Sequence, residues 1–390
     1  MRWQYKFTVL ALCTVAFFVT MAGRLAISPL IPDIADEFRV SYGIIGAALT
    51  GMWLAYGLMQ FPSGILADKY GERLVILLSV TGTAAMAIAV AGAPIFAVFV
   101  GATVVLGGVA GLHYSVATTL FARTFDDVGT AIGIHNTGGT IAGLVTPVAV
   151  VWVAVLLGWR GGVAFVAAVG LPVAALFAWR IKPTPPRRPD ESLRRRLRPA
   201  YLLDLLARPA IAFTLVIAIL TEFAWQAVSS FLPTFLIEYR GLSATMAAAG
   251  FSLYFVALGV GQVGVGAAAD RFGIDRSIVA SLLVGVLAVA ILLAIPGTFA
   301  GVIGVVLLGF GMSFSPAVFP RFLREFTDAE QTAGFGLVRT VYMVVAALGS
   351  VVTGVIADVL GWGPAFGFLA ALLGVVIVGL LANWLFDLGL

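Results

Sequence analysis

The sequence predicts an all-α membrane protein made of two similar halves, each a bundle of six transmembrane helices. Hydrophobic residues make up 61% of the 390 residues and charged residues only 11%. A soluble globular protein has about 25% charged residues, so this chain lacks the side chains to cover a surface in water. Apolar runs long enough to cross a bilayer recur along the chain. A short charged string also occurs twice, once in each half.

The repeated string separates two apolar runs in each half. It reads GILADKYG from Gly64 to Gly71 and GAAADRFG from Gly266 to Gly273, about 202 residues later. Other pairs share nearly the same offset: Glu37 with Glu238, Gln60 with Gln262, and Gly158-Trp159 with Gly361-Trp362. A constant offset indicates a parallel repeat, whose halves are related by an axis along the membrane normal.

Twelve spans result when the apolar runs are divided at charges and at clusters of Gly or Pro. The first run is too long for a signal peptide, so we expect it to remain as the first span. The longest runs imply helices that tilt or extend past the bilayer. The spans lie near residues 7–31, 41–63, 74–92, 95–121, 128–157, 160–181, 209–237, 243–267, 275–295, 298–320, 330–357 and 362–385.

The distribution of Lys and Arg predicts the orientation. With the N-terminus in the cytoplasm, all but five of the 23 Lys and Arg residues are cytoplasmic, as the positive-inside rule requires. An even number of spans returns the C-terminus to the same side. We therefore expect a multi-pass protein of the plasma (inner) membrane with both termini in the cytoplasm.

The domains follow from the same division. The N-terminal bundle is expected over residues 1–181, a cytoplasmic basic linker over 182–208 and the C-terminal bundle over 209–390. The cations of the linker favour contact with anionic lipid headgroups, and residues 193–206 have the composition of an amphipathic surface helix. Nucleic-acid binding is not expected.

Away from the ends of the predicted spans, three charged side chains lie at bilayer depth: Arg24, Glu222 and Arg339. A charge at bilayer depth costs at least about 2.5–3.5 kcal/mol and is therefore a candidate functional residue. Arg24 and Glu222 occupy the equivalent first spans of the two halves. On the repeat offset they lie three residues apart, hence on nearly the same helix face.

Arginine presents a planar fork of donors that fits a carboxylate or a similar anion. Two arginines in an otherwise uncharged region would attract a small anionic solute. A glutamate in a partly dry site holds its proton more tightly than in water, so Glu222 is the candidate for proton coupling. Two alternatives remain: a permanent ion pair between Glu222 and an arginine, and an Arg24 side chain that reaches the outer surface past lipid.

Polar and aromatic residues near these charges complete the predicted binding site. Trp53, Tyr56 and Gln60 follow an i, i+3, i+7 pattern and so share one helix face. For each candidate, a hydrogen bond between helices is the competing interpretation. Besides Arg24 and Arg339, the substrate-binding candidates are Tyr56, Gln60, His113, Asn136, Trp225, Gln226 and Tyr342.

The repeated string supplies candidate gating residues. Its glycines permit a tight turn and close helix approach, and each aspartate is placed to accept N–H groups at a helix start or to pair with a cation. The neighbouring cations are expected to contact lipid headgroups. The competing interpretation is a plain charged turn. The gating candidates are Gly64, Asp68, Gly71, Arg73, Gly266, Asp270, Arg271 and Gly273.

The paired string on a twelve-span chain resembles the major facilitator superfamily of solute transporters. The resemblance implies a monomer whose two bundles rock around a central site. It also implies that the repeated loop latches the outward-open state, although Glu72 replaces the cation usual at that position. Gly111-Leu-His113-Tyr114 and the segment from Gly129 to Gly139 resemble prokaryotic organic-anion and sugar-phosphate permeases and fosmidomycin-resistance exporters.

Proton-driven drug antiporters of the same superfamily carry G-P-x-x-G-G in span 5 and an arginine early in span 4. This chain instead has GLVTPVA over residues 143–149 and Thr103-Val104 at those places. The leading hypothesis is therefore a secondary active transporter that moves a small organic or inorganic anion, with possible coupling to protons. The alternative is a proton-coupled efflux pump for lipophilic or cationic compounds, with Glu222 as the counter-charge.

Other classes of function find little support. No HExxH, CxxC or GxSxG string occurs among the spans, so neither an enzyme with catalytic residues nor a bound cofactor or metal is expected. A sensor that binds a solute without moving it remains a further hypothesis.

Overall fold

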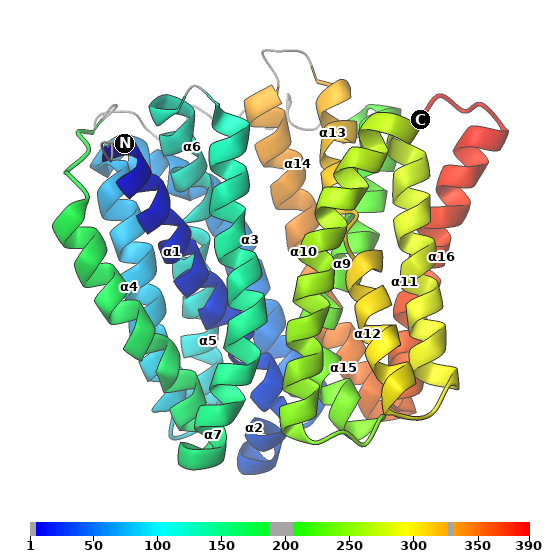
Figure 1. Ribbon diagram of the computed structural model, residues 1–390, viewed down its shortest axis with the longest axis horizontal. Helices are drawn as coiled ribbons and strands as arrows, with labels where there is room; N and C mark the ends of the chain where they lie inside the picture. Colours follow the sequence, from blue (N-terminus) through cyan, green and yellow to red (C-terminus); the bar gives the residue numbers. More distant parts are fainter. Residues whose placement is uncertain (1–4, 126, 187–205, 327–330) are drawn as a thin grey trace. The chain divides into compact units, whose positions relative to one another are not determined.

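The computed structural model describes residues 5–125, 127–186, 206–326 and 331–390. This part of the chain forms helices and no strands (Figure 1). Its contacts divide it into two compact units: unit 1 contains Met1–Val40 and Ala48–Leu197, and unit 2 contains Ser41–Ala47 and Arg198–Leu390. The surface helix predicted within the linker falls almost wholly on residues 187–205, outside the described part.

Unit 1 holds the helices of the first half, except for the first turns of α3. They pack through a buried cluster of aliphatic and aromatic side chains contributed mainly by α1, α4, α6 and α7, with Ala67 of α3. The helices are α1 (Tyr5–Leu25), the 3-10 helix η1 (Ser28–Leu30), α2 (Ile31–Phe38), α3 (Tyr42–Tyr70), α4 (Glu72–Ala91), α5 (Phe96–Gly111), α6 (Tyr114–Thr124) and α7 (Val128–Arg180).

Unit 2 holds the helices of the second half. Within it α9 packs against α14, α15 and α16, and α11 packs against α12 and α16. The helices are α9 (Pro209–Glu238), α10 (Ala244–Phe272), α11 (Ile274–Ala294), α12 (Thr298–Gly311), α13 (Ser315–Arg324), α14 (Gln331–Ala346), α15 (Leu348–Leu360) and α16 (Trp362–Leu385).

Within the described residues, eleven helices are long and apolar enough to cross a membrane. The longest, α7, has 53 residues and at a rise of about 1.5 Å per residue would be about 80 Å long. The hydrocarbon core of a bilayer is only about 30 Å thick. Gly158 interrupts α7 with φ 72° and ψ 172°, and counting the two parts separately gives the twelve predicted spans.

Four spans predicted as continuous are broken. The first is divided between α1 and η1 after Leu25, and the eleventh between α14 and α15 at Ala347. The other two are broken at equivalent points of the two halves. The fourth is divided between α5 and α6 at His113, and the tenth between α12 and α13 at Phe314. At both breaks the backbone tightens into i to i−3 hydrogen bonds, from His113 N–H to Ala110 O (3.3 Å) and from Ser313 N–H to Phe310 O (3.2 Å). Hydropathy did not reveal the breaks because the residues around them are apolar.

The sequence repeat is also a repeat of backbone conformation. Gly71 and Gly273, which close the two copies of the charged string, have φ 86° and 95° with ψ 147° and 154°. Gly158 and Gly361, the other predicted pair, have φ 72° and 91° with ψ 172° and 170°. This region of φ and ψ is essentially restricted to glycine, so each half requires glycine at the same two turns.

The first turn of α3 lies in unit 2, against α15. The Asp358 carboxylate accepts hydrogen bonds from the backbone N–H groups of Tyr42 (3.0 Å) and Gly43 (2.7 Å). A Cβ on Gly354 would lie 2.5 Å from the Tyr42 carbonyl oxygen, so the two backbones approach closely. A carboxylate on one helix thus satisfies donors at the start of another.

Substituting the two loop glycines should reveal the strain in the turns. Gly273→Ala should cost about 1–3 kcal/mol of unfolding free energy for its backbone conformation alone, because no atom lies within 4 Å of the added Cβ. Gly71→Ala should cost more, since its Cβ would lie 2.1 Å from the Thr184 carbonyl oxygen. Thermal unfolding of the purified protein in detergent would measure both costs.

Gly133→Ala is the matched control, because Gly133 lies inside α7 with open space around its Cβ. It should leave the melting temperature nearly unchanged or raise it slightly. Equal melting temperatures for all three variants would contradict this account of the turns.

Candidate functional site

The candidate site in unit 1 begins with Arg24 in the last turn of α1. Only 4% of this residue is exposed. Its Nε donates to the Thr20 carbonyl oxygen (3.3 Å), and one terminal nitrogen lies 3.1 Å from the Met21 sulfur. A side chain that extended along lipid to the membrane surface would be exposed, so this burial supports a role inside the protein.

Aromatic rings of α3 cover the Arg24 guanidinium. Its central carbon lies 3.9 Å from the centre of the Tyr56 ring and 5.2 Å from that of Trp53. The two rings meet edge to face with centroids 6.2 Å apart. A cation over an aromatic face gains about 2 kcal/mol when both are removed from water. The predicted shared face of Trp53 and Tyr56 therefore provides a surface that stabilises the buried cation.

Gln60, one turn beyond Tyr56, brings an amide to the same face of α3. It is 6% exposed, and its Oε1 accepts a hydrogen bond from the Ser115 hydroxyl (2.8 Å). Its Nε2 is buried and has no hydrogen-bond partner among the described residues. A buried donor without a partner is costly, so Gln60 has donor capacity available for a bound acceptor.

Two histidines lie beside this face. His113 directly precedes α6, and His135 belongs to α7. Both are fully buried, with ring centroids 5.2 Å apart. Phe17 of α1 contacts both rings, at centroid distances of 5.8 Å and 4.8 Å. Within the described part of the chain, neither nitrogen of His135 has a hydrogen-bond partner, and His113 lies near the Cys13 backbone. His113 also lies within electrostatic range of Arg24.

The break between α5 and α6 contributes a helix N-terminus at the same place. α6 begins at Tyr114, directly after His113, and no side chain caps it. The first N–H groups of a helix point outward and carry a partial positive charge. In transporters, broken spans of this kind supply groups to solute sites. Arg24, the Gln60 amide and the start of α6 are therefore donors placed near one another.

The predicted residues of unit 2 lie on two helices that pack together. Glu222, Trp225 and Gln226 are on α9, while Arg339 and Tyr342 are on α14. Glu222, Trp225 and Arg339 are partly exposed, whereas Gln226 and Tyr342 are buried. The predicted residues of unit 2 therefore lie on one pair of packed helices.

Asn136 is separate from the buried groups of unit 1. It follows His135 on α7, but its side chain is exposed, whereas that of His135 is buried. Its role in solute binding stays a prediction. Sequence reasoning did not select Phe17 or Ser115, because neither is charged and their contacts with α7 and α3 link distant parts of the chain.

The first copy of the charged string contacts the end of α7. Arg73 donates from its guanidinium to the Ala178 carbonyl oxygen (2.6 Å), and its backbone N–H donates to the Thr184 hydroxyl (3.0 Å). Glu72, which departs from the pattern of the resembled family, is 2% exposed and accepts a hydrogen bond from Arg123 of α6 (2.5 Å). Glu72 therefore joins the loop to α6, the short second part of the broken fourth span.

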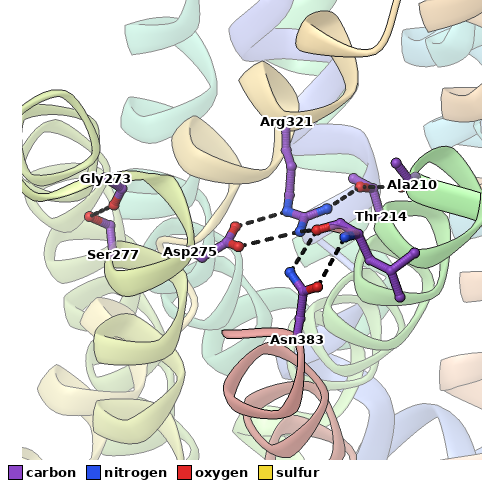
Figure 2. A network of polar contacts seen from close by, with 8 residues as sticks. Ala210, Thr214, Gly273, Asp275, Ser277, Arg321 and Asn383 are labelled. Atoms are coloured by element: carbon purple, nitrogen blue, oxygen red, sulfur yellow. Dashed lines mark hydrogen bonds and ion pairs between the residues drawn. The ribbon is translucent and has the colours of Figure 1, made fainter. Parts of the chain in front are cut away.

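The second copy has a corresponding arrangement (Figure 2). Asp275, two residues after Gly273, accepts from Arg321 of α13 (2.9 Å). Arg321 also donates to the Thr214 hydroxyl of α9 (2.5 Å) and to the Leu390 carbonyl oxygen (2.7 Å). In each unit a carboxylate after the charged string pairs with an arginine on the short helix. The positions of Glu72 and Asp275 directly after the repeated strings were the available sequence signal for these pairs.

Comparisons with known proteins agree with this architecture. A family model described as Major Facilitator Superfamily matches residues 13–251 and 214–388. The chain is 27% identical over 188 residues to a probable sulfoacetate transporter of Cupriavidus necator, covering 47% of this chain and 43% of that protein. It is 23% identical over 251 residues to a hexuronate transporter of Bacillus subtilis, covering 61% and 58% of the two chains.

A third relative matches over more of the chain. The transcription regulatory protein OpdE of Pseudomonas aeruginosa is 27% identical over 387 residues, covering 94% of this chain and 90% of that one. Among solved structures, a bacterial homologue of the human lysosomal transporter Spinster, inward-facing and unoccupied, aligns with a TM-score of 0.81. The identity is 16% and the alignment covers 97% of each chain, so this likeness shows the fold.

The Arg321 network leads to a stability prediction. Arg321→Gln should lower the unfolding free energy by about 2 kcal/mol, because each hydrogen bond to a charged group contributes about 1.5–3 kcal/mol and Asp275, at 40% exposure, is partly screened by water. Arg324→Gln changes an exposed arginine of the same helix and should stay within about 0.5 kcal/mol. Thermal unfolding in detergent would compare them; similar losses for both would contradict a specific role for Arg321.

Proposed function

The chain belongs to the major facilitator superfamily of small-solute transporters, and on this premise we propose that it carries a small organic anion across the membrane by alternating access. The candidate solutes bear a carboxylate or sulfonate group. Two relatives support this class, since sulfoacetate and hexuronate are both organic anions. The chain spans only 43% and 58% of these two relatives, so the residues of the candidate site must carry the argument.

The observation that carries the proposal is Arg24, a cation that is 4% exposed and covered by aromatic rings. A guanidinium has five N–H donors in a planar fork that matches a carboxylate or sulfonate. In a site with little water, opposite charges attract more strongly than in solution. An anion would contact the N–H groups at the edge of the guanidinium, so the face of the guanidinium could keep its contact with the Tyr56 ring.

Neighbouring groups extend the positive character of the site. The Gln60 amide nitrogen is a buried donor without a partner in the described part of the chain, and α6 begins nearby with its N–H groups uncapped by a side chain. Helix N-termini bind anions through these N–H groups and the helix dipole. Together these donors favour an anionic solute over a cationic one.

Glu222 is the proposed carrier of a coupled proton. It is partly exposed on α9 of unit 2 and lies within a predicted span, where a permanent carboxylate charge is costly. A carboxyl group that is protonated on one side of the membrane and ionised on the other couples solute movement to a proton gradient. We place the protein in the plasma (inner) membrane with both termini in the cytoplasm, because the Lys and Arg distribution favours that orientation.

Counterflow in liposomes tests the proposal directly. Vesicles holding purified protein and an unlabelled anion should accumulate the same labelled anion, across a panel of small carboxylates, sulfonates and inorganic anions. Arg24→Gln should weaken the apparent affinity for the accepted anion about 10- to 150-fold, because about 1.5–3 kcal/mol is lost with each hydrogen bond to a charged group. Arg24→Lys keeps the positive charge but lacks the planar set of N–H donors. Its apparent affinity should lie between those of the unmodified protein and of Arg24→Gln.

Arg160→Gln is the matched control, since Arg160 is an arginine of unit 1 that pairs with Glu37 and the Ala93 carbonyl oxygen, away from Arg24. It should keep the affinity of the unmodified protein. Accumulation of no anion above empty vesicles would contradict the proposal. So would accumulation of lipophilic cations, which would favour the efflux-pump alternative, or solute binding without any movement, which would favour a sensor.

Glu222→Gln should separate exchange from proton drive. The glutamine variant stays neutral, so counterflow of the accepted anion should persist while uptake driven by a pH gradient is lost. Parallel measurements on the same vesicles, with and without an imposed pH gradient, would show the difference. Unchanged pH-driven uptake would exclude Glu222 as the proton carrier.

A further inference from the structure

A groove outside the candidate site runs along unit 2 between α10, α11 and α12, which lie side by side (Figure 1). Its volume is about 630 Å³. Small residues keep it open, and larger apolar side chains form its walls. The small residues are Gly261, Gly264, Ala268 and Ala280, and the larger ones are Val260, Val265, Val284, Leu307 and Phe310.

The hydroxyl groups along this groove are used inside the protein. Ser281 donates to the carbonyl oxygens of Phe310 (3.2 Å) and Gly311 (3.1 Å), and Ser277 donates to that of Gly273 (2.9 Å). The groove therefore presents an apolar surface along its length. An apolar surface of this kind fits a hydrocarbon chain better than a polar solute.

One end of the groove carries a cation. Arg276, in the first turn of α11, is the only charged residue that lines it within the described part of the chain. Its side chain is exposed, and its guanidinium lies 5.9 Å from the centre of the Trp384 ring. Phe272 and Trp384, which are 58% and 67% exposed, flank this end. Exposed aromatic rings beside a cation are typical of the level of the lipid headgroups.

A second cavity continues from the same cation. It has a volume of about 610 Å³ between α11, α13 and α16, and shares Phe272, Arg276 and Ala280 with the groove. Its own charges nearly balance: Arg321 is paired with Asp275, and Arg324, Glu325 and Asp387 also line it. Glu325 and Asp387 would repel an anion, so the favourable position for a negative group is beside Arg276, which lines both cavities.

We propose that this groove binds an anionic phospholipid, with its phosphate at Arg276. One acyl chain would lie along the groove and the other in the apolar part of the second cavity. A cation at headgroup level between two apolar channels matches the shape and charge of a two-chain anionic lipid. The site lies on unit 2 alone and is independent of the proposed solute specificity.

Lipid retention tests the proposal on the full-length protein. Purified, delipidated protein would be titrated with phosphatidylglycerol or phosphatidylcholine, and bound lipid would be counted by native mass spectrometry. The unmodified protein should prefer phosphatidylglycerol. Arg276→Gln should weaken its binding about fivefold, the effect of one cation near the membrane surface, and remove the preference. Arg180→Gln, which changes an exposed cation of α7 that lines neither cavity, should leave the preference for phosphatidylglycerol unchanged.

A second variant tests the groove itself. Gly264→Leu places a side chain in the groove without a clash, because no atom lies within 4 Å of the added Cβ. It should weaken binding of both lipids. Gly374→Leu, which also enters open space but on α16 and outside both cavities, should not.

Equal binding of the two lipids to the unmodified protein would overturn the proposal. Unchanged phosphatidylglycerol binding after Arg276→Gln would overturn the placement of the headgroup at Arg276. Unchanged lipid binding after Gly264→Leu would overturn the placement of an acyl chain in the groove. If Arg276→Gln folds poorly, Arg276→Lys should keep the phosphatidylglycerol preference, and its loss in a folded Lys variant would also overturn the headgroup assignment.

Discussion

The cost of a charge inside a bilayer is the constraint on which the account depends. A cation at that depth costs at least about 2.5–3.5 kcal/mol, and Arg24 is 4% exposed. The Tyr56 and Trp53 rings, the Thr20 carbonyl oxygen and the Met21 sulfur meet part of that cost. An anionic solute would offset more of that cost, because opposite charges attract strongly where there is little water. This is the physical reason for assigning solute binding to this part of unit 1.

The two units share the same turns and helix breaks, but their polar contacts use partly different residues. Both use glycine at the turn that ends the charged string, and both break the fourth span of their half. Both also join the start of the following helix to a short helix through a carboxylate and an arginine, Glu72 with Arg123 and Asp275 with Arg321. The second network is larger, because Arg321 also reaches α9 and the end of the chain. A duplicated backbone has therefore kept its turns while its polar networks diverged.

Much of the fold was predictable because its signals are local. Continuous apolar runs identified the spans, and the repeated glycines marked turns whose φ values only glycine readily adopts. The pattern of Trp53 and Tyr56 correctly predicted a shared helix face. The breaks at His113 and Phe314 were missed, because hydropathy does not distinguish a continuous helix from a broken one.

The candidate site was less predictable because its contacts join distant segments. Phe17 contacts histidines on two other helices, and no periodicity within α1 indicates this. The Gln60–Ser115 hydrogen bond links residues 55 positions apart. The sequence indicated that Arg24 is unusual by its charge, but its aromatic cover depends on how α1 and α3 pack. The gating roles of the charged strings, the proton-coupling role of Glu222 and the solute-binding roles of all the candidate residues stay predictions.

The most direct test of the central claim is the position of a bound anion. Counterflow would first identify an accepted organic anion, and crystals would then be grown with a bromine-containing congener that the protein also transports. The account predicts an anomalous bromine peak in unit 1 and density for the acidic group within hydrogen-bonding distance of the Arg24 guanidinium. A fully occupied anion elsewhere in the protein, with none beside Arg24, would contradict it.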